Sequence, residues 1–165
     1  MRKNIKNLIL GGAQISSVKY GITNNSFIRK DELTKIINFA KKNKINFIDT
    51  AKSYENSERF IGDMDCKFNI ITKLHKLNNQ NISEKLIINS FEDSLKKLKK
   101  KRIYGLLIHG VKGLSKSNIL KIVYILRKLK KTKKIKYIGV SIYDPKDIKI
   151  FWQNWKPDII QVPYN

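Results

Sequence analysis

The sequence has one cysteine, Cys66, and only three prolines in 165 residues. A single cysteine excludes an internal disulfide and is typical of proteins in a reducing compartment, so we expect a cytoplasmic location. With His75 and His109 it lacks the spacing of metal ligands, and no metal is expected. No apolar run approaches the ~20 residues that a membrane helix needs. The apolar stretch of the basic N-terminus is too short for a signal sequence, so no membrane partner is expected.

Acidic residues are also scarce, and the resulting excess of positive charge has two interpretations. Lys and Arg number 35 against 13 Asp and Glu, a formal net charge of +22. A polyanion such as nucleic acid would explain this excess. However, Lys, Asn and Ile are all abundant and all have AT-rich codons, so a genomic bias explains the excess without any function. The lysines occur in every segment, arginines are few, and no basic stripe is interleaved with aromatic residues. The sequence therefore favours a solvated basic surface and argues against a nucleic-acid partner.

Short apolar runs alternate with amphipathic segments along the whole chain. The runs are nearly continuous in apolar, β-branched residues, which is typical of strands covered on both faces. The intervening segments have apolar residues at helical spacing, and the last one begins with Asp144 as N-cap and Pro145 at the first helical position. The predicted strands are residues 7–12, 46–51, 68–73, 104–110, 136–141 and 158–165, and the predicted helices are residues 31–43, 56–63, 83–100, 115–131 and 143–155.

This alternation predicts a parallel α/β sheet with right-handed crossovers, in a single domain over residues 1–165. Two architectures compete: an open doubly wound sheet and a (β/α) barrel. A dinucleotide-binding doubly wound sheet would have G-x-G-x-x-G after its first strand. Here the first strand continues into "GGAQISS", which does not match. The barrel is therefore favoured.

Polar residues collect at the carboxyl ends of the predicted strands. In a parallel barrel all these ends lie on one face, which is the face that carries catalysis. Residues far apart in the sequence are therefore expected to form one site. The second to fifth strands end at Asp49, Lys73, His109 and Ser141, while Gln161 lies in the sixth strand and Asn165 at its end.

Tyr54, in the loop after the second strand, is the candidate proton donor of this site. A phenol has an ordinary pKa of about 10, and a nearby ammonium lowers it. Lys73 can supply the ammonium, and Asp49 can orient that ammonium. His109 can hydrogen-bond a substrate oxygen at the same place. These groups suit protonation of a carbonyl oxygen. The carbonyl carbon then needs a hydride, which no side chain supplies and a nicotinamide cofactor does.

The stretches "INFIDTAKSYENSERFIG", "IITK", "LLIHG" and "IGVS" resemble the aldo-keto reductases, in that family's order and with similar spacing. The resemblance runs from "LILGGAQ" to "IIQVPYN". It implies that Asp49, Tyr54, Lys73 and His109 are the catalytic residues. Tyr54 would be the general acid, Lys73 and Asp49 would tune it, and His109 would orient the carbonyl.

The resemblance also implies a cofactor, NADPH, and a small-molecule aldehyde or ketone as substrate. Ser141 and Gln161 match positions that hold the nicotinamide carboxamide, and we place Asn165 in the same cofactor site. Tyr20, after the first strand, is the candidate residue lining the substrate pocket. Ile142 stands where many relatives have Asn, which weakens the cofactor contact.

The family barrel has eight strands, whereas six are expected here, so the predicted fold is an incomplete (β/α)8 TIM-type barrel. Six strands leave two parallel edges unpaired. We therefore predict a chain that is poorly stable or self-associates through those edges. The alternative function is a truncated, catalytically inactive barrel fragment that acts as a binding or regulatory module, or has no activity alone.

Overall fold

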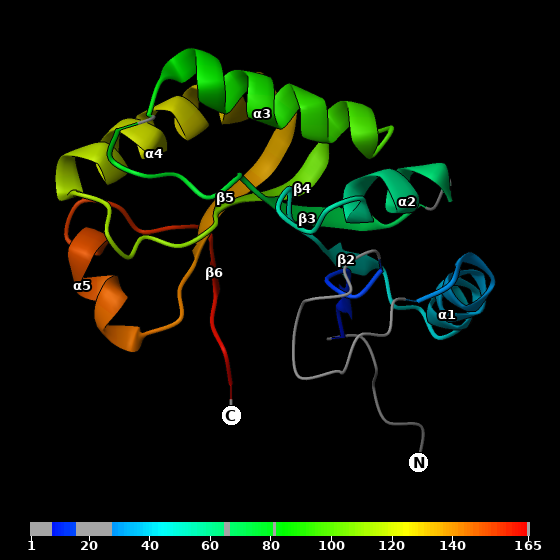
Figure 1. Cartoon of the computed structure of the whole chain (residues 1–165). Helices are drawn as coiled ribbons and strands as arrows, with labels where there is room; N and C mark the ends of the chain where they lie inside the picture. Colours follow the sequence, from blue (N-terminus) through cyan, green and yellow to red (C-terminus); the bar gives the residue numbers. More distant parts are fainter. Residues whose placement is uncertain (1–7, 16–27, 65–66, 81, 165) are drawn as a thin grey trace.

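The computed structural model describes residues 8–15, 28–64, 67–80 and 82–164. Six parallel strands form one sheet whose spatial order follows the chain from β1 to β6. The sheet curls, with β1 and β6 at its two edges and the helices on its outer side (Figure 1). This confirms the predicted incomplete (β/α)8 barrel. The strands are β1 (Leu10–Gly11), β2 (Phe47–Asp49), β3 (Asn69–Lys73), β4 (Ile103–Ile108), β5 (Ile135–Ser141) and β6 (Ile159–Gln161).

The helices connect consecutive strands, and serine caps fix where two of them begin. The hydroxyls of Ser83 and Ser115 accept hydrogen bonds from backbone N–H groups three residues later, which satisfies donors that the first helical turn leaves free. None of the helices in the described ranges has the length and apolar composition needed to cross a membrane. The helices are α1 (Lys30–Lys42), α2 (Ser57–Asp63), α3 (Glu84–Lys97), α4 (Lys116–Lys131), the 3₁₀ helix η2 (Pro145–Asp147) and α5 (Ile148–Phe151).

The last predicted helix, residues 143–155, is shorter than expected. Asp144 does cap it, because its Oδ1 accepts the N–H of Lys146 at 2.8 Å. After Phe151 the chain forms turns instead of continuing the helix. Trp155 then packs its buried ring against Phe151, with 5.6 Å between ring centres. Trp155 therefore fills the core from the segment that follows the turn, whereas Trp152, within the turn, is exposed.

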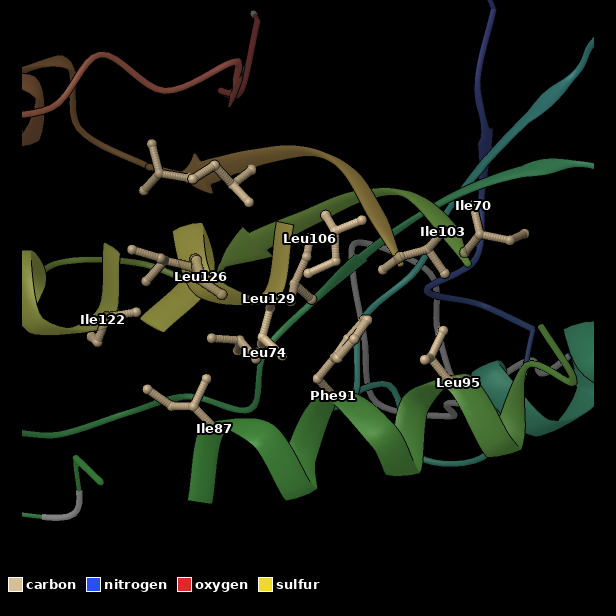
Figure 2. Close-up of a cluster of buried hydrophobic side chains, with 14 of the residues drawn as sticks. Ile70, Leu74, Ile87, Phe91, Leu95, Ile103, Leu106, Ile122, Leu126 and Leu129 are labelled. Carbon is tan, nitrogen blue, oxygen red and sulfur yellow. The ribbon is translucent and has the colours of Figure 1, made fainter. Parts of the chain in front are cut away.

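The main hydrophobic layer lies between the sheet and helices α3 and α4. Figure 2 shows Ile87, Phe91 and Leu95 of α3 directed toward the strands, where Leu74 and Leu106 meet them. Phe91 is fully buried in this layer. Burial of a side chain of this size contributes about 1.5–3 kcal/mol. Packing against α3 and α4 therefore fixes the positions of β3, β4 and β5, and with them the residues at their carboxyl ends.

Candidate active site

The carboxyl ends of β2 and β3 bring two of the predicted residues into direct contact. Lys73 Nζ donates to both carboxylate oxygens of Asp49, at 2.7 and 2.9 Å, and to the carbonyl oxygen of Thr50 at 3.1 Å. An ammonium has three N–H donors, so this group is fully satisfied. The Lys73 side chain is only 2% exposed. A buried ion pair gains little net stability because both charges lose water, so stability alone does not account for this one.

Tyr54 lies beside this ion pair, in the loop that joins β2 to α2. Its N–H donates to the carbonyl oxygen of Ala51 at 3.0 Å, and its own carbonyl oxygen accepts from the N–H of Ser57 at 2.8 Å. These turns fix the loop backbone. The buried ring has Lys73 Nζ 5.2 Å from its centre. A positively charged side chain next to a phenol favours its phenolate form.

His109 follows β4 and packs edge-on against Tyr54, with 5.9 Å between ring centres and 88° between ring planes. Burial lowers the pKa of His109 to about 4, and the nearby Lys73 ammonium is the next cause. The imidazole is therefore neutral at pH 7. Its Nδ1 lies 2.9 Å from the hydroxyl of Ser53. A neutral imidazole has one N–H donor and one acceptor nitrogen.

Gln161 connects the last strand to the same centre. Its Nε2 donates to Asp49 Oδ2 at 3.1 Å. Its Oε1 is buried and has no hydrogen-bond partner within the described residues. Ser141, which is also buried, is the register partner of Gln161 in the pairing of β5 with β6.

Six of the eight residues proposed from the sequence thus lie at the carboxyl ends of the strands or in the adjoining loop. Five of them are linked by the contacts above: Asp49, Tyr54, Lys73, His109 and Gln161. The remaining two of the eight proposed residues, Tyr20 and Asn165, lie outside the described residues.

Sequence reasoning missed a chain of hydroxyl groups beneath the Tyr54 loop. The hydroxyls of Thr50 and Ser57 lie 2.9 Å apart, and Ser57 Oγ donates to the carbonyl oxygen of Gly12 at 2.7 Å. The N–H of Gly12 in turn donates to the carbonyl oxygen of Asp49 at 2.7 Å. A β-carbon at Gly12 would stand 2.7 Å from that oxygen, so only glycine permits this approach. The chain of contacts ties the end of β1 to the loop that carries Tyr54.

A buried carboxylate and a lysine were also missed, and both attach this region to neighbouring elements. Glu58, 1% exposed, accepts a 2.7 Å hydrogen bond from the Thr72 hydroxyl, and its burial raises its pKa. Lys52 Nζ donates to Asp93 Oδ2 at 2.7 Å and to the carbonyl oxygen of Ser90 at 3.1 Å. The only available signal was their place in the stretch 47–62, because their partners lie elsewhere in the sequence.

Comparisons with known proteins identify the family of this chain. The sequence profile of the aldo/keto reductase family matches residues 7–165, so the chain belongs to that family. Among solved structures, an aldo/keto reductase from Brucella melitensis is 25% identical with a TM-score of 0.69; the match covers 94% of this chain and 57% of that one. A glycerol dehydrogenase from Gluconobacter oxydans is 27% identical with a TM-score of 0.68, over 95% of this chain and 51% of that one.

An aldo-keto reductase from Bombyx mori, solved in complex with NADP, is 20% identical with a TM-score of 0.68; the match covers 96% of this chain and 54% of that one. This last likeness concerns the fold alone. The chain thus spans between 51% and 57% of the length of these three structures. Comparison with curated protein sequences gave no match.

Proposed function

We propose that the protein reduces an aldehyde or ketone to an alcohol with a nicotinamide cofactor. One observation carries the proposal: a fully hydrogen-bonded, buried Lys73–Asp49 pair lies beside Tyr54, and Tyr54 packs against a neutral His109. This set suits proton delivery to a carbonyl oxygen. Membership of the aldo/keto reductase family supports the same reaction class.

In the proposed reaction the Tyr54 hydroxyl gives its proton to the carbonyl oxygen of the substrate. The Lys73 ammonium stabilises the phenolate that remains, and Asp49 keeps that ammonium in place at 2.7 Å. His109 is neutral, so an imidazole N–H can donate a hydrogen bond to the substrate oxygen without competing for the proton. A bound nicotinamide supplies the hydride that the carbonyl carbon needs.

The residues proposed for the cofactor are Ser141, Gln161 and Asn165. Gln161 Oε1 is a buried acceptor without a partner among the described residues, and a carboxamide N–H is the kind of donor that it lacks. The cofactor therefore suits the site. We propose NADPH because the resemblance to the aldo/keto reductase family implies it. Tyr20 is proposed to line the substrate pocket.

Replacement of Tyr54 by Phe tests this proposal. Removal of a general acid lowers turnover by about 10²- to 10⁴-fold. The variant is expected to lose NADPH-dependent aldehyde reduction while it keeps cofactor affinity and a wild-type circular dichroism spectrum. The matched control is Tyr124→Phe, because Tyr124 is an exposed residue on α4. Equal turnover in wild type and Tyr54→Phe would rule out Tyr54 as the acid.

A second candidate is a non-catalytic barrel module that binds or regulates without turnover. The observation in its favour is the six-stranded sheet, in which neither β1 nor β6 has a second neighbour among the described residues. Unpaired parallel edges promote association, and we propose self-association through β1 and β6. A folded chain without measurable affinity for NADPH or NADH would favour this candidate. Saturable cofactor binding together with turnover would exclude it.

A further inference from the structure

A basic groove lies at the amino ends of β3, β4 and β5, the opposite end of the sheet from the candidate active site. Its volume is ≈ 810 Å³. Of the thirteen described residues that line it, seven are lysine or arginine and none is aspartate or glutamate. We call this feature the basic groove. Strand order places its charges together, although they lie far apart in the sequence.

Helix stability explains only some of these charges. Lys130 lies in the last turn of α4 and Lys133 directly follows the C-cap, Thr132, where cations interact favourably with the helix dipole. Lys130 also forms an ion pair with Asp158 at 2.7 Å. This account does not extend to the basic residues of the groove that lie away from the end of α4. Those with exposed side chains are Lys67 before β3, Lys101 and Arg102 before β4, and Lys136 in β5.

These four side chains have no ion-pair partner within 4.0 Å among the residues that the structure describes. Neighbouring lysines outside the basic groove do have acidic partners. In an adjacent hollow of ≈ 600 Å³, Lys134 pairs with Glu92 at 2.7 Å, and Lys99, which also lines it, pairs with Asp63 at 2.8 Å. Like charges held close together without counterions repel one another and destabilise the fold. The composition of the whole chain favours a solvated basic surface, but the concentration of unpaired cations in this one hollow is better explained by an anionic ligand.

We propose that the basic groove binds the phosphodiester backbone of a nucleic acid. Lysine and arginine contacts to successive phosphates supply affinity without reading the sequence. Base stacking is not part of the proposal, because the Tyr104 ring already contacts the rings of Phe47 and Tyr137 and has Lys136 Nζ 5.2 Å from its centre. The protein is therefore expected to bind with little sequence preference.

The shape of the basic groove favours a nucleic acid over a lipid surface. Its charges line a hollow, which admits a flexible chain of phosphates, whereas a bilayer presents a broad flat face. Stable binding to lipid is helped by apolar side chains that insert into the membrane. None of the exposed large apolar side chains of the described residues lines the basic groove. This inference does not rest on the proposed reductase activity.

Two variants of equal charge test the inference. The groove variant replaces Lys67, Lys101, Arg102 and Lys136 by Gln. The control variant replaces four exposed lysines outside the basic groove, none with an ion pair among the described residues. Each lowers the formal net charge from +22 by four, to +18. The control positions are Lys35, Lys85, Lys112 and Lys116.

The measurement is fluorescence anisotropy of a labelled single-stranded DNA oligonucleotide, titrated with the full chain at several salt concentrations. The wild type and control variant are expected to bind with similar Kd. The groove variant should bind roughly tenfold or more weakly, and the slope of log K against log salt should fall by about three, because each lost phosphate contact removes about 0.7. Circular dichroism checks that all three proteins are folded.

Three results would overturn the inference. The first is an equal loss of affinity in both variants, which would mean that net charge alone drives binding. The second is absence of oligonucleotide binding by the wild type at physiological salt. The third is tighter binding to vesicles of phosphatidylserine and phosphatidylcholine than to the oligonucleotide, which would identify a lipid surface instead.

Discussion

Acidification is expected to destabilise the protein through His109. Its pKa is about 4 in the folded state, against 6.5 for an unperturbed histidine. Between these two pH values the imidazole is protonated in the unfolded chain, whereas it stays neutral in the folded protein. The contribution of His109 to stability is therefore full above pH 6.5 and is lost as the pH falls toward 4. At about 1.36 kcal/mol for each pH unit, the full contribution is roughly 3 kcal/mol, of which about 2 kcal/mol disappears between pH 7 and pH 5.

The total pH dependence does not isolate this contribution. Burial raises the pKa of Glu58, so this group acts in the opposite direction and stabilises the fold as the pH falls. The comparison must therefore be between wild type and His109→Gln, which cannot titrate. In urea unfolding at pH 7 and pH 5, the wild type is expected to lose about 2 kcal/mol more than the variant, since only the wild type has the shifted imidazole.

Proton NMR gives an independent check because the chain has only two histidines, His75 and His109. The variant His75→Gln assigns the two imidazole signals. The His109 signal should keep the shift of a neutral ring from pH 8 to pH 5. A His109 signal that titrates near pH 6.5 would refute the reasoning, and so would identical pH dependence of unfolding in wild type and His109→Gln.

Three further predictions concern stability and are measured by urea unfolding at pH 7. Phe91→Ala removes the fully buried ring between α3 and the sheet, and is expected to cost about 3–5 kcal/mol; a loss below about 1 kcal/mol would contradict the packing described here. Lys44→Gly and Lys133→Gly replace residues with φ of 59° and 61°, and each should raise the free energy of unfolding by up to roughly 1 kcal/mol because the left-handed conformation costs a side chain more than glycine. Destabilisation by both glycine substitutions would contradict this account of the left-handed conformation. Gly139→Ala places a β-carbon against the carbonyl oxygen of Ile159, so it should loosen β6 and lower stability by about 1–3 kcal/mol; a neutral effect would argue against this pairing.

The sequence was sufficient for the element order because each strand appears as a short, nearly continuous apolar run between amphipathic segments. The runs 68–73 and 136–141 correspond closely to β3, Asn69–Lys73, and β5, Ile135–Ser141. The segment 143–155 was harder to predict. Phe151 and Trp155 are buried from a short helix and from the segment after the turn that follows it, and apolar spacing alone does not distinguish that arrangement from a longer helix.

The candidate site was predictable where a residue ends a strand, since a parallel sheet brings strand ends together. Asp49 and Lys73 meet for this reason. Glu58 was not predictable in the same way. It lies in the polar-looking helix "SERFIGD", and only the tertiary fold shows that its partner is Thr72 on β3 and that its carboxylate is buried.

The lysines of this chain illustrate the same limit and connect the two proposed sites. Lys73 is the last residue of β3 and gives all three of its hydrogen bonds to oxygen atoms of Asp49 and Thr50. Lys136 lies near the start of β5, exposed, with no acidic partner among the described residues. The two ends of the parallel strands thus place lysines in two environments. At the carboxyl ends Lys73 is buried and paired with a carboxylate, and at the amino ends Lys136 is exposed to solvent near other cations. Because the first ammonium is already paired, charge changes in the basic groove should alter nucleic-acid binding and leave carbonyl reduction unchanged. Loss of both activities in the groove variant would mean that the two ends of the sheet are coupled.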